Sequence, residues 1–173
     1  FEGLLAEGSP RSLGRTEEVV LVVLRRPGRL DELFDCLFND DEIVRMRAGD
    51  ALEKVCRDRP DLFQSYIPRL FNEVSKIDQP SVQWHLAQML AEVTLNVKER
   101  SDAVRLLKRN LSQSKDWIVI TCTMDSLAHF AQDDVRLRRW FIDELREYQG
   151  SEYKSIATRA RKLLAKLTVN PSL

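Results

Sequence analysis

Three side chains capable of chemistry lie close together in the sequence: Cys122, Asp125 and His129. On a helix they would share one side, and a thiolate, a carboxylate and an imidazole are groups that bind zinc or support nucleophilic catalysis. Cys122 and His129 are, however, two helical turns apart, about 10 Å along the axis, whereas zinc–ligand bonds measure about 2 Å. Asp125 and His129, four residues apart, are expected to pair at the surface. We therefore predict no metal site, no cofactor and no catalytic residue.

The composition is that of a helical, globular protein without net charge. The chain has 173 residues, of which 43% are hydrophobic and 31% charged, with only six Gly and six Pro, and this balance favours helices over a turn-rich β fold. Lys and Arg together number 27, as do Asp and Glu, so nucleic-acid binding would need a local basic patch. The longest apolar run, residues 19–24, is too short to span a bilayer. We expect a cytoplasmic protein with reduced cysteines and no membrane partner.

A helical pattern recurs at intervals of 37 or 38 residues. Apolar residues recur four, seven, eight and eleven positions after an anchor residue, a spacing that places them on one face of a helix. A second amphipathic segment precedes each copy and ends in a turn-forming stretch. The unit is therefore a helix–turn–helix, repeated four times. The four anchors and the leucine eight positions after each are Val44 and Leu52, Val82 and Leu90, Val119 and Leu127, and Ile156 and Leu164.

Helical hairpins of this kind bury their apolar faces only by stacking, which predicts an all-α fold: an α-solenoid of four hairpins with an N-terminal capping helix near residues 16–25. Residues 1–15 are expected to be poorly ordered, and residues 169–173 to form a C-terminal tail. Residues 16–168 are expected to form a single domain whose repeats span about 29–58, 60–96, 98–132 and 133–168.

Residues 33–55, LFDCLFNDDEIVRMRAGDALEKV, resemble a HEAT repeat, with leucines in a first helix, an acidic turn, Val-Arg, and then Ala and Ala-Leu in a second helix. The other three copies keep the apolar positions but lose the Val-Arg pair. The resemblance covers roughly residues 29–168 and implies an armadillo-like α-solenoid. Most proteins of this kind are scaffolds and adaptors. A minority bind nucleic acid or cofactor-bearing partners, including HEAT-like alkylpurine DNA glycosylases and repeat proteins related to bilin lyases, and no residue of this sequence is specific to either group.

The outward side of the second helices is the predicted binding surface. By helical phase, positions 2, 5, 6, 9 and 10 after each anchor point away from the core. Trp84 falls there beside the small residues Ala87 and Ala91, as a binding anchor would, although a neighbouring repeat could equally cover its ring. Charge also changes along the chain, from acids in residues 31–42 to bases in residues 153–173. The predicted partner-binding residues are Trp84, Gln88, Asp125, Arg161 and Lys162.

We therefore expect a non-catalytic scaffold or adaptor that binds another protein on its concave second-helix face. The alternative is a nucleic-acid-binding or glycosylase-type protein that uses the same face. The neutral net charge and an acidic first repeat, which would repel a duplex, weigh against this alternative. A third hypothesis is a purely structural segment of a larger assembly, which exposed apolar surface at either terminus would favour.

Overall fold

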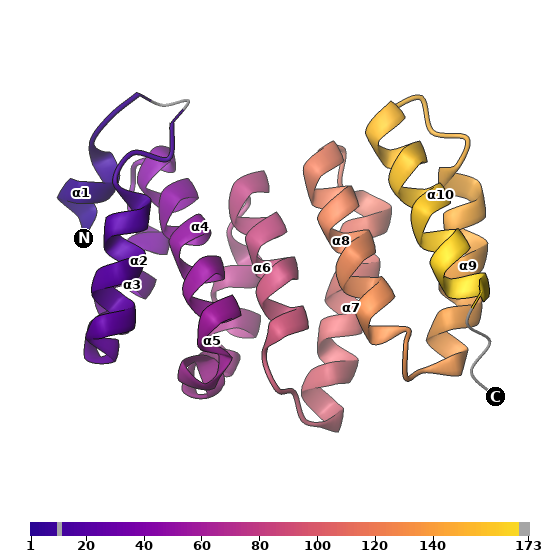
Figure 1. Ribbon diagram of the computed structural model, residues 1–173, viewed down its shortest axis with the longest axis horizontal. Helices are drawn as coiled ribbons and strands as arrows, with labels where there is room; N and C mark the ends of the chain where they lie inside the picture. Colours follow the sequence, from indigo (N-terminus) through magenta and orange to yellow (C-terminus); the bar gives the residue numbers. More distant parts are fainter. Residues whose placement is uncertain (10–11, 170–173) are drawn as a thin grey trace. The chain divides into compact units, whose positions relative to one another are not determined.

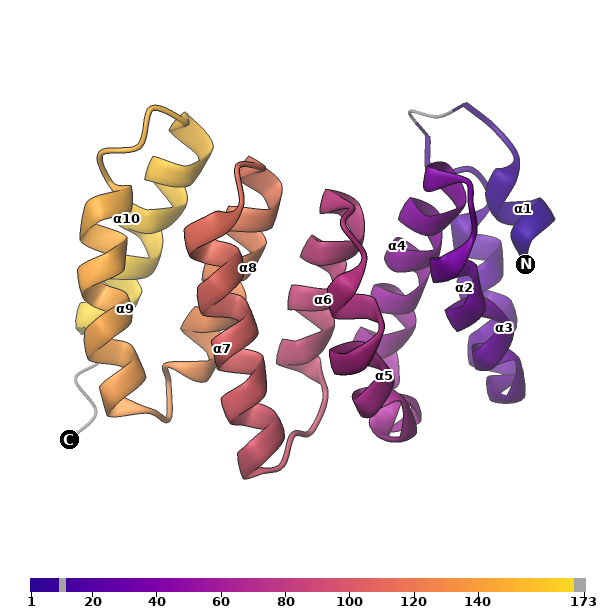
Figure 2. The same ribbon diagram turned by 180° about the vertical axis from the view of Figure 1, so that it is seen from behind.

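The computed structural model describes residues 1–9 and 12–169, and helices joined by short connections make up this part of the chain. Figures 1 and 2 show the helices from opposite sides. The chain divides into two compact units, residues 1–95 and residues 96–173. The all-helical class predicted from composition and periodicity is confirmed over the described residues.

The first unit combines two long helices with several short ones. The long helices α4 (Glu42–Asp58) and α6 (Pro80–Glu92) pack against each other. Pro60 and Pro68 explain part of the fragmentation between them, because proline has no donor N–H to continue a helical ladder. The shorter elements are α1 (Glu2–Ala6), α2 (Thr16–Arg25), α3 (Leu30–Asp35) and α5 (Ile67–Asn72), with 3-10 turns at Pro27–Arg29, Cys36–Phe38, Pro60–Tyr66 and Val74–Lys76.

The second unit consists of four longer helices, α7 (Val97–Gln113), α8 (Trp117–Phe130), α9 (Val135–Tyr148) and α10 (Lys154–Val169). Helix α7 packs against α8, α9 against α10, and α8 also packs against α10. Side-chain caps fix where the first three begin: Asn96 and Glu99 form a capping box, Asp116 accepts from the first turn of α8, and Asp134 accepts from that of α9.

The predicted apolar positions form the core of both units. All four anchor residues are at most 3% exposed, and the leucines eight positions later are fully buried except Leu164, which is half-buried. The second helix of each copy is therefore present where the periodicity predicted it, as α4, α6, α8 and α10. Helix α2 likewise coincides with the expected capping helix at 16–25. Of the expected C-terminal tail, Val169 ends α10, and residues 170–173 lie outside the described part of the chain.

The N-terminal segment differs from its expectation of poor order. Residues 2–6 form α1, which packs against α2 and α4, and Leu5 is completely buried. The backbone then reverses through Gly8 and Gly14, which have φ angles of 96° and 54°, a region that favours glycine. A Cβ on Gly14 would lie 2.5 Å from the carbonyl oxygen of Glu7, so this position admits no side chain. The segment is folded onto α4.

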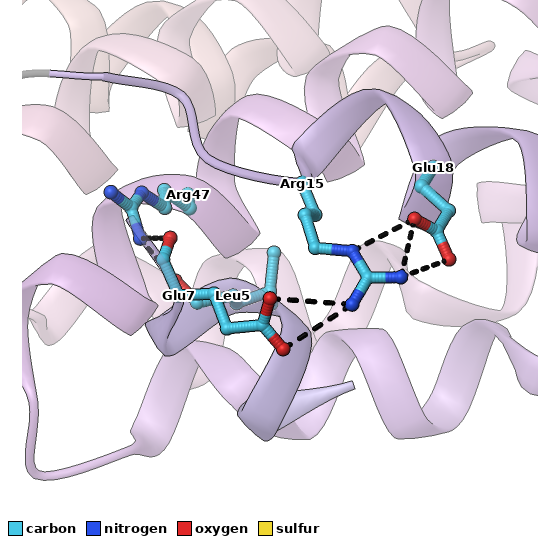
Figure 3. Close-up of polar contacts among 5 residues, drawn as sticks. All are labelled: Leu5, Glu7, Arg15, Glu18 and Arg47. Atoms are coloured by element: carbon cyan, nitrogen blue, oxygen red, sulfur yellow. Dashed lines mark hydrogen bonds and ion pairs between the residues drawn. The ribbon is translucent and has the colours of Figure 1, made fainter. Parts of the chain in front are cut away.

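Arg47 of α4 holds this segment in place. Its side chain is fully buried, and its guanidinium donates to the main-chain carbonyls of Leu5 at 2.6 Å, Glu7 at 2.7 Å, Ser9 at 2.7 Å and Ser12 at 3.0 and 3.1 Å. Five N–H groups thus meet five hydrogen bonds, the full donor capacity of arginine. On the surface beside it, Arg15 bridges the carboxylates of Glu7 and Glu18 (Figure 3).

We predict that Arg47→Met destabilises the first unit by about 3 kcal/mol, because one buried and four partly buried hydrogen bonds are lost together. Urea unfolding measures the loss, and amide hydrogen exchange should show that residues 2–9 lose protection. Arg25→Met is the matched control, since Arg25 is exposed and its replacement is expected to change stability by less than about 0.5 kcal/mol. Equal stabilities of the two variants would contradict the role given to Arg47.

Candidate functional site

Some of the positions predicted to face solvent are instead covered by a neighbouring helix. Those at 2, 5 and 9 after the anchor are largely covered where another second helix follows: Thr121, Met124 and Ala128 of α8 are buried in the unit in which α8 packs against α10. In α4, Gly49 is buried against α6, and a Cβ added to it would lie 3.2 Å from Cδ2 of His85. The phase prediction was therefore wrong at these positions, because they turn sideways toward the next helix rather than outward.

Trp84 also departs from its expected exposure. Its ring is half-buried, and Ala87, which was expected to leave open space beside it, is only 1% exposed. Gln88 is also half-buried, and its Oε1 lies out of reach of solvent. The pair does not form the exposed aromatic anchor that the sequence suggested. Both residues belong to the first unit, on α6.

A partly buried polar cluster occupies the α4–α6 face beside them. His85 lies over Gly49, and its burial lowers the imidazole pKa to about 4, although the Asp50 carboxylate acts in the opposite direction. The amide of Gln88 interacts with the imidazole, but with a geometry short of a well-formed hydrogen bond. Lys54 pairs with Asp50 at 2.8 Å and with Glu17 of α2.

Glu53 belongs to the same face and is 6% exposed. Desolvation raises the pKa of its carboxyl, while Arg57, at 3.1 Å, acts to lower it. The ionic groups of this face are thus largely paired within the unit, which makes the cluster a poor surface for a partner.

The other three predicted residues lie in the second unit. Asp125 of α8 is bound by Arg159 of α10, so its charge is neutralised within the unit. Arg161 and Lys162 are exposed on α10. Arg161 donates only a long 3.4 Å hydrogen bond to Thr158, and within residues 1–9 and 12–169 neither cation forms an ion pair.

Two further cations extend this surface, Lys154 and Lys166, which the sequence analysis did not select. Both are exposed, and among the described residues they have no carboxylate partner. We call Lys154, Arg161, Lys162 and Lys166 the α10 basic face. These residues run about 18 Å along the helix at 1.5 Å per residue. The helix contains no acidic residue, and the small Thr158 and Ala165 lie between the cations.

Lys162 and Lys166 are equivalent to Asp125 and His129 of α8, which are exposed as well, whereas the surroundings of Arg161 differ between the two helices. Thr158, Arg161 and Ala165 occupy the positions that Thr121, Met124 and Ala128 occupy in α8, yet all three are exposed. Lys154 and Lys166 could have been selected from the sequence because residues 154–169 contain no acid.

The five sequence-predicted residues therefore do not fall in one unit: two lie in the first and three in the second. Composition separates the units in the same way, since residues 1–95 carry 12 basic and 17 acidic residues, and residues 96–173 carry 15 basic and 10 acidic residues. Net positive charge and unpaired cations coincide on the second unit, which makes the α10 basic face the stronger candidate for binding.

The cysteine and histidine residues considered for chemistry are not assembled into a metal centre. Cys122 is half-buried, whereas His129 is exposed beside Phe130, with ring centroids 5.5 Å apart. Over the described ranges, no group of three or more His, Cys, Asp or Glu side chains is close enough to hold an ion.

Comparison with known proteins gives no family assignment: no family model, curated protein or solved structure matches the chain. Among the described helices, none combines the length and apolar character needed to cross a bilayer.

We predict that His85 makes the first unit less stable in acid. Because the pKa is about 4 in the folded state and about 6.5 in an unfolded chain, the unfolded state takes up the proton first. Stability is then lost as the pH falls from about 6.5 toward 4, by up to about 3 kcal/mol. His85→Gln should remove this part of the pH dependence, measured as the difference between the urea-unfolding curves of the two proteins. Parallel pH profiles for both proteins would contradict the burial of a neutral imidazole.

Proposed function

We propose that this chain is a non-catalytic protein-interaction module whose second unit binds an acidic segment of a partner protein along the α10 basic face. The observation that carries the proposal is the set of four exposed cations on one helix that contains no acid. Opposite charges across an interface guide association and fix orientation. We also propose that the helices form a HEAT-like α-solenoid, on the strength of the 37–38-residue period and the burial of its anchor residues. A cytoplasmic location fits the buried thiols of Cys36 and Cys56.

An acidic helical segment fits this face better than a nucleic acid does. The cations follow one straight helix, so a partner helix with acids on one side can place a carboxylate near each of them. A duplex would also meet the exposed carboxylate of Glu147 on the neighbouring helix α9, where Asp143 is paired with Arg146. Phosphate backbones are repelled by such carboxylates.

We predict that a helical peptide with glutamates on one face binds the protein more tightly than a peptide of equal composition with its glutamates spread around the helix. The interaction should weaken as salt rises, because exposed charges are screened beyond about 8 Å at physiological ionic strength. Lys162→Glu with Lys166→Glu should reduce the affinity at least about tenfold, because both attractions become repulsions. Fluorescence anisotropy of the labelled peptide measures each constant.

The matched control carries Arg136→Glu and Arg139→Glu, which change the same charge at two exposed positions on α9 of the same unit. This control is expected to retain most of the affinity, because Arg136 and Arg139 lie outside the α10 basic face and their replacement weakens only the long-range attraction of the peptide. Equal losses in both double variants would show that only net charge matters. Tighter binding of a DNA duplex than of either peptide would favour the nucleic-acid alternative.

A further inference from the structure

Two large aromatic side chains are exposed where α8 and α10 begin. Trp117, the first residue of α8, is 47% exposed, and Tyr153, directly before α10, is 57% exposed. Large aromatic side chains are usually well buried in folded proteins, and exposed ones mark binding surfaces when they cluster. The proposed function, which rests on charge, makes no use of either ring.

The fold brings these two positions to the same end of the second unit. Helices α8 and α10 pack against each other and run in the same direction (Figure 1). Trp117 and Tyr153, which lie where these helices begin, are therefore at the same end of the unit. Trp117 stands two residues before the anchor Val119, and Lys154 stands two residues before the anchor Ile156, so they are equivalent positions on adjacent helices. Tyr153 therefore directly precedes the first cation of the α10 basic face, and Trp117 lies at the same end of the adjacent helix.

We infer that the acidic segment bound by the α10 basic face also carries a large apolar side chain at one end, which docks against Trp117 and Tyr153. This inference rests on the proposed function and names the partner chemistry more closely. Acids along the segment meet Lys162 and Lys166, while the apolar residue covers the two rings. Buried aromatic residues are enriched among those that dominate binding energy, whereas exposed ion pairs contribute little each.

A single-stranded nucleic acid is the competing occupant, since bases stack on exposed aromatic rings. The flanking residues favour a peptide. An exposed carboxylate, Glu152, directly precedes Tyr153, and Asp116 directly precedes Trp117, although the latter is occupied in capping Ile118 and Val119. A phosphate backbone that approached either ring would meet a carboxylate, whereas the main chain of a peptide is neutral there.

The test compares two labelled helical peptides that carry the same face of glutamates, one with a terminal phenylalanine and one with serine in its place. Wild-type protein should bind the phenylalanine peptide about tenfold more tightly. Trp117→Ser with Tyr153→Ser should abolish this advantage while leaving the affinity for the serine peptide unchanged. Val97→Ser with Val135→Ser is the control, because it removes two exposed apolar residues at the starts of α7 and α9, and it should keep the advantage. Circular dichroism checks that each variant remains helical.

The outcomes separate this inference from the proposed function. Equal binding of both peptides by the wild-type protein would overturn the aromatic docking and leave the electrostatic one standing. Failure of both peptides to bind would overturn the two together. An oligouridylate that binds more tightly than either peptide, and loses affinity in the Trp117→Ser, Tyr153→Ser variant, would replace the peptide by a single-stranded nucleic acid.

Discussion

The side-by-side packing of second helices is the constraint on which both the core and the candidate binding face depend. Where α4 packs against α6, and where α8 packs against α10, close approach of the two helices requires small residues at some positions of the side turned toward the next helix. Gly49 in α4 and Ala128 in α8 meet this requirement. Helix α10 has no such neighbour in the described chain, so the equivalent side can carry arginine. Equivalent positions are therefore buried in α8 and exposed in α10.

The first unit has a second requirement, which is to satisfy a buried guanidinium. Arg47 is surrounded by main-chain carbonyls rather than by a carboxylate, and these hydrogen bonds add to the burial of Leu5 in holding the N-terminal segment on α4. An unmet N–H or C=O at this depth would cost about 1–3 kcal/mol each. The folding of residues 1–9 onto α4 and the burial of Arg47 thus depend on each other. The turn at Gly14 allows both, because a side chain there would meet the Glu7 carbonyl and the Arg47 guanidinium.

The sequence predicted what depends on local spacing and missed what depends on distant neighbours. The anchors Val44, Val82, Val119 and Ile156 are buried in helices, as a 3.6-residue period requires. Helical phase separates core from non-core, but it does not separate a solvent-facing side from one that faces another helix, which is why the positions of Met124 and Ala128 were expected to be exposed and are buried. Arg47 gave no signal at all, because its partners lie 35 to 42 residues earlier in the chain. Arg161 and Lys162 were selected from helical phase together with charge, and both are exposed.

Docking of an acidic partner segment on the α10 basic face is tested most directly by a titration of ¹⁵N-labelled protein with the acidic-faced helical peptide, in which backbone amide shifts report the contact residue by residue. We expect shifts concentrated in residues 154–166 and at the start of α8, which fade as salt is raised. Shifts that concentrate on α4 and α6 of the first unit, or that persist unchanged at high salt, would contradict it.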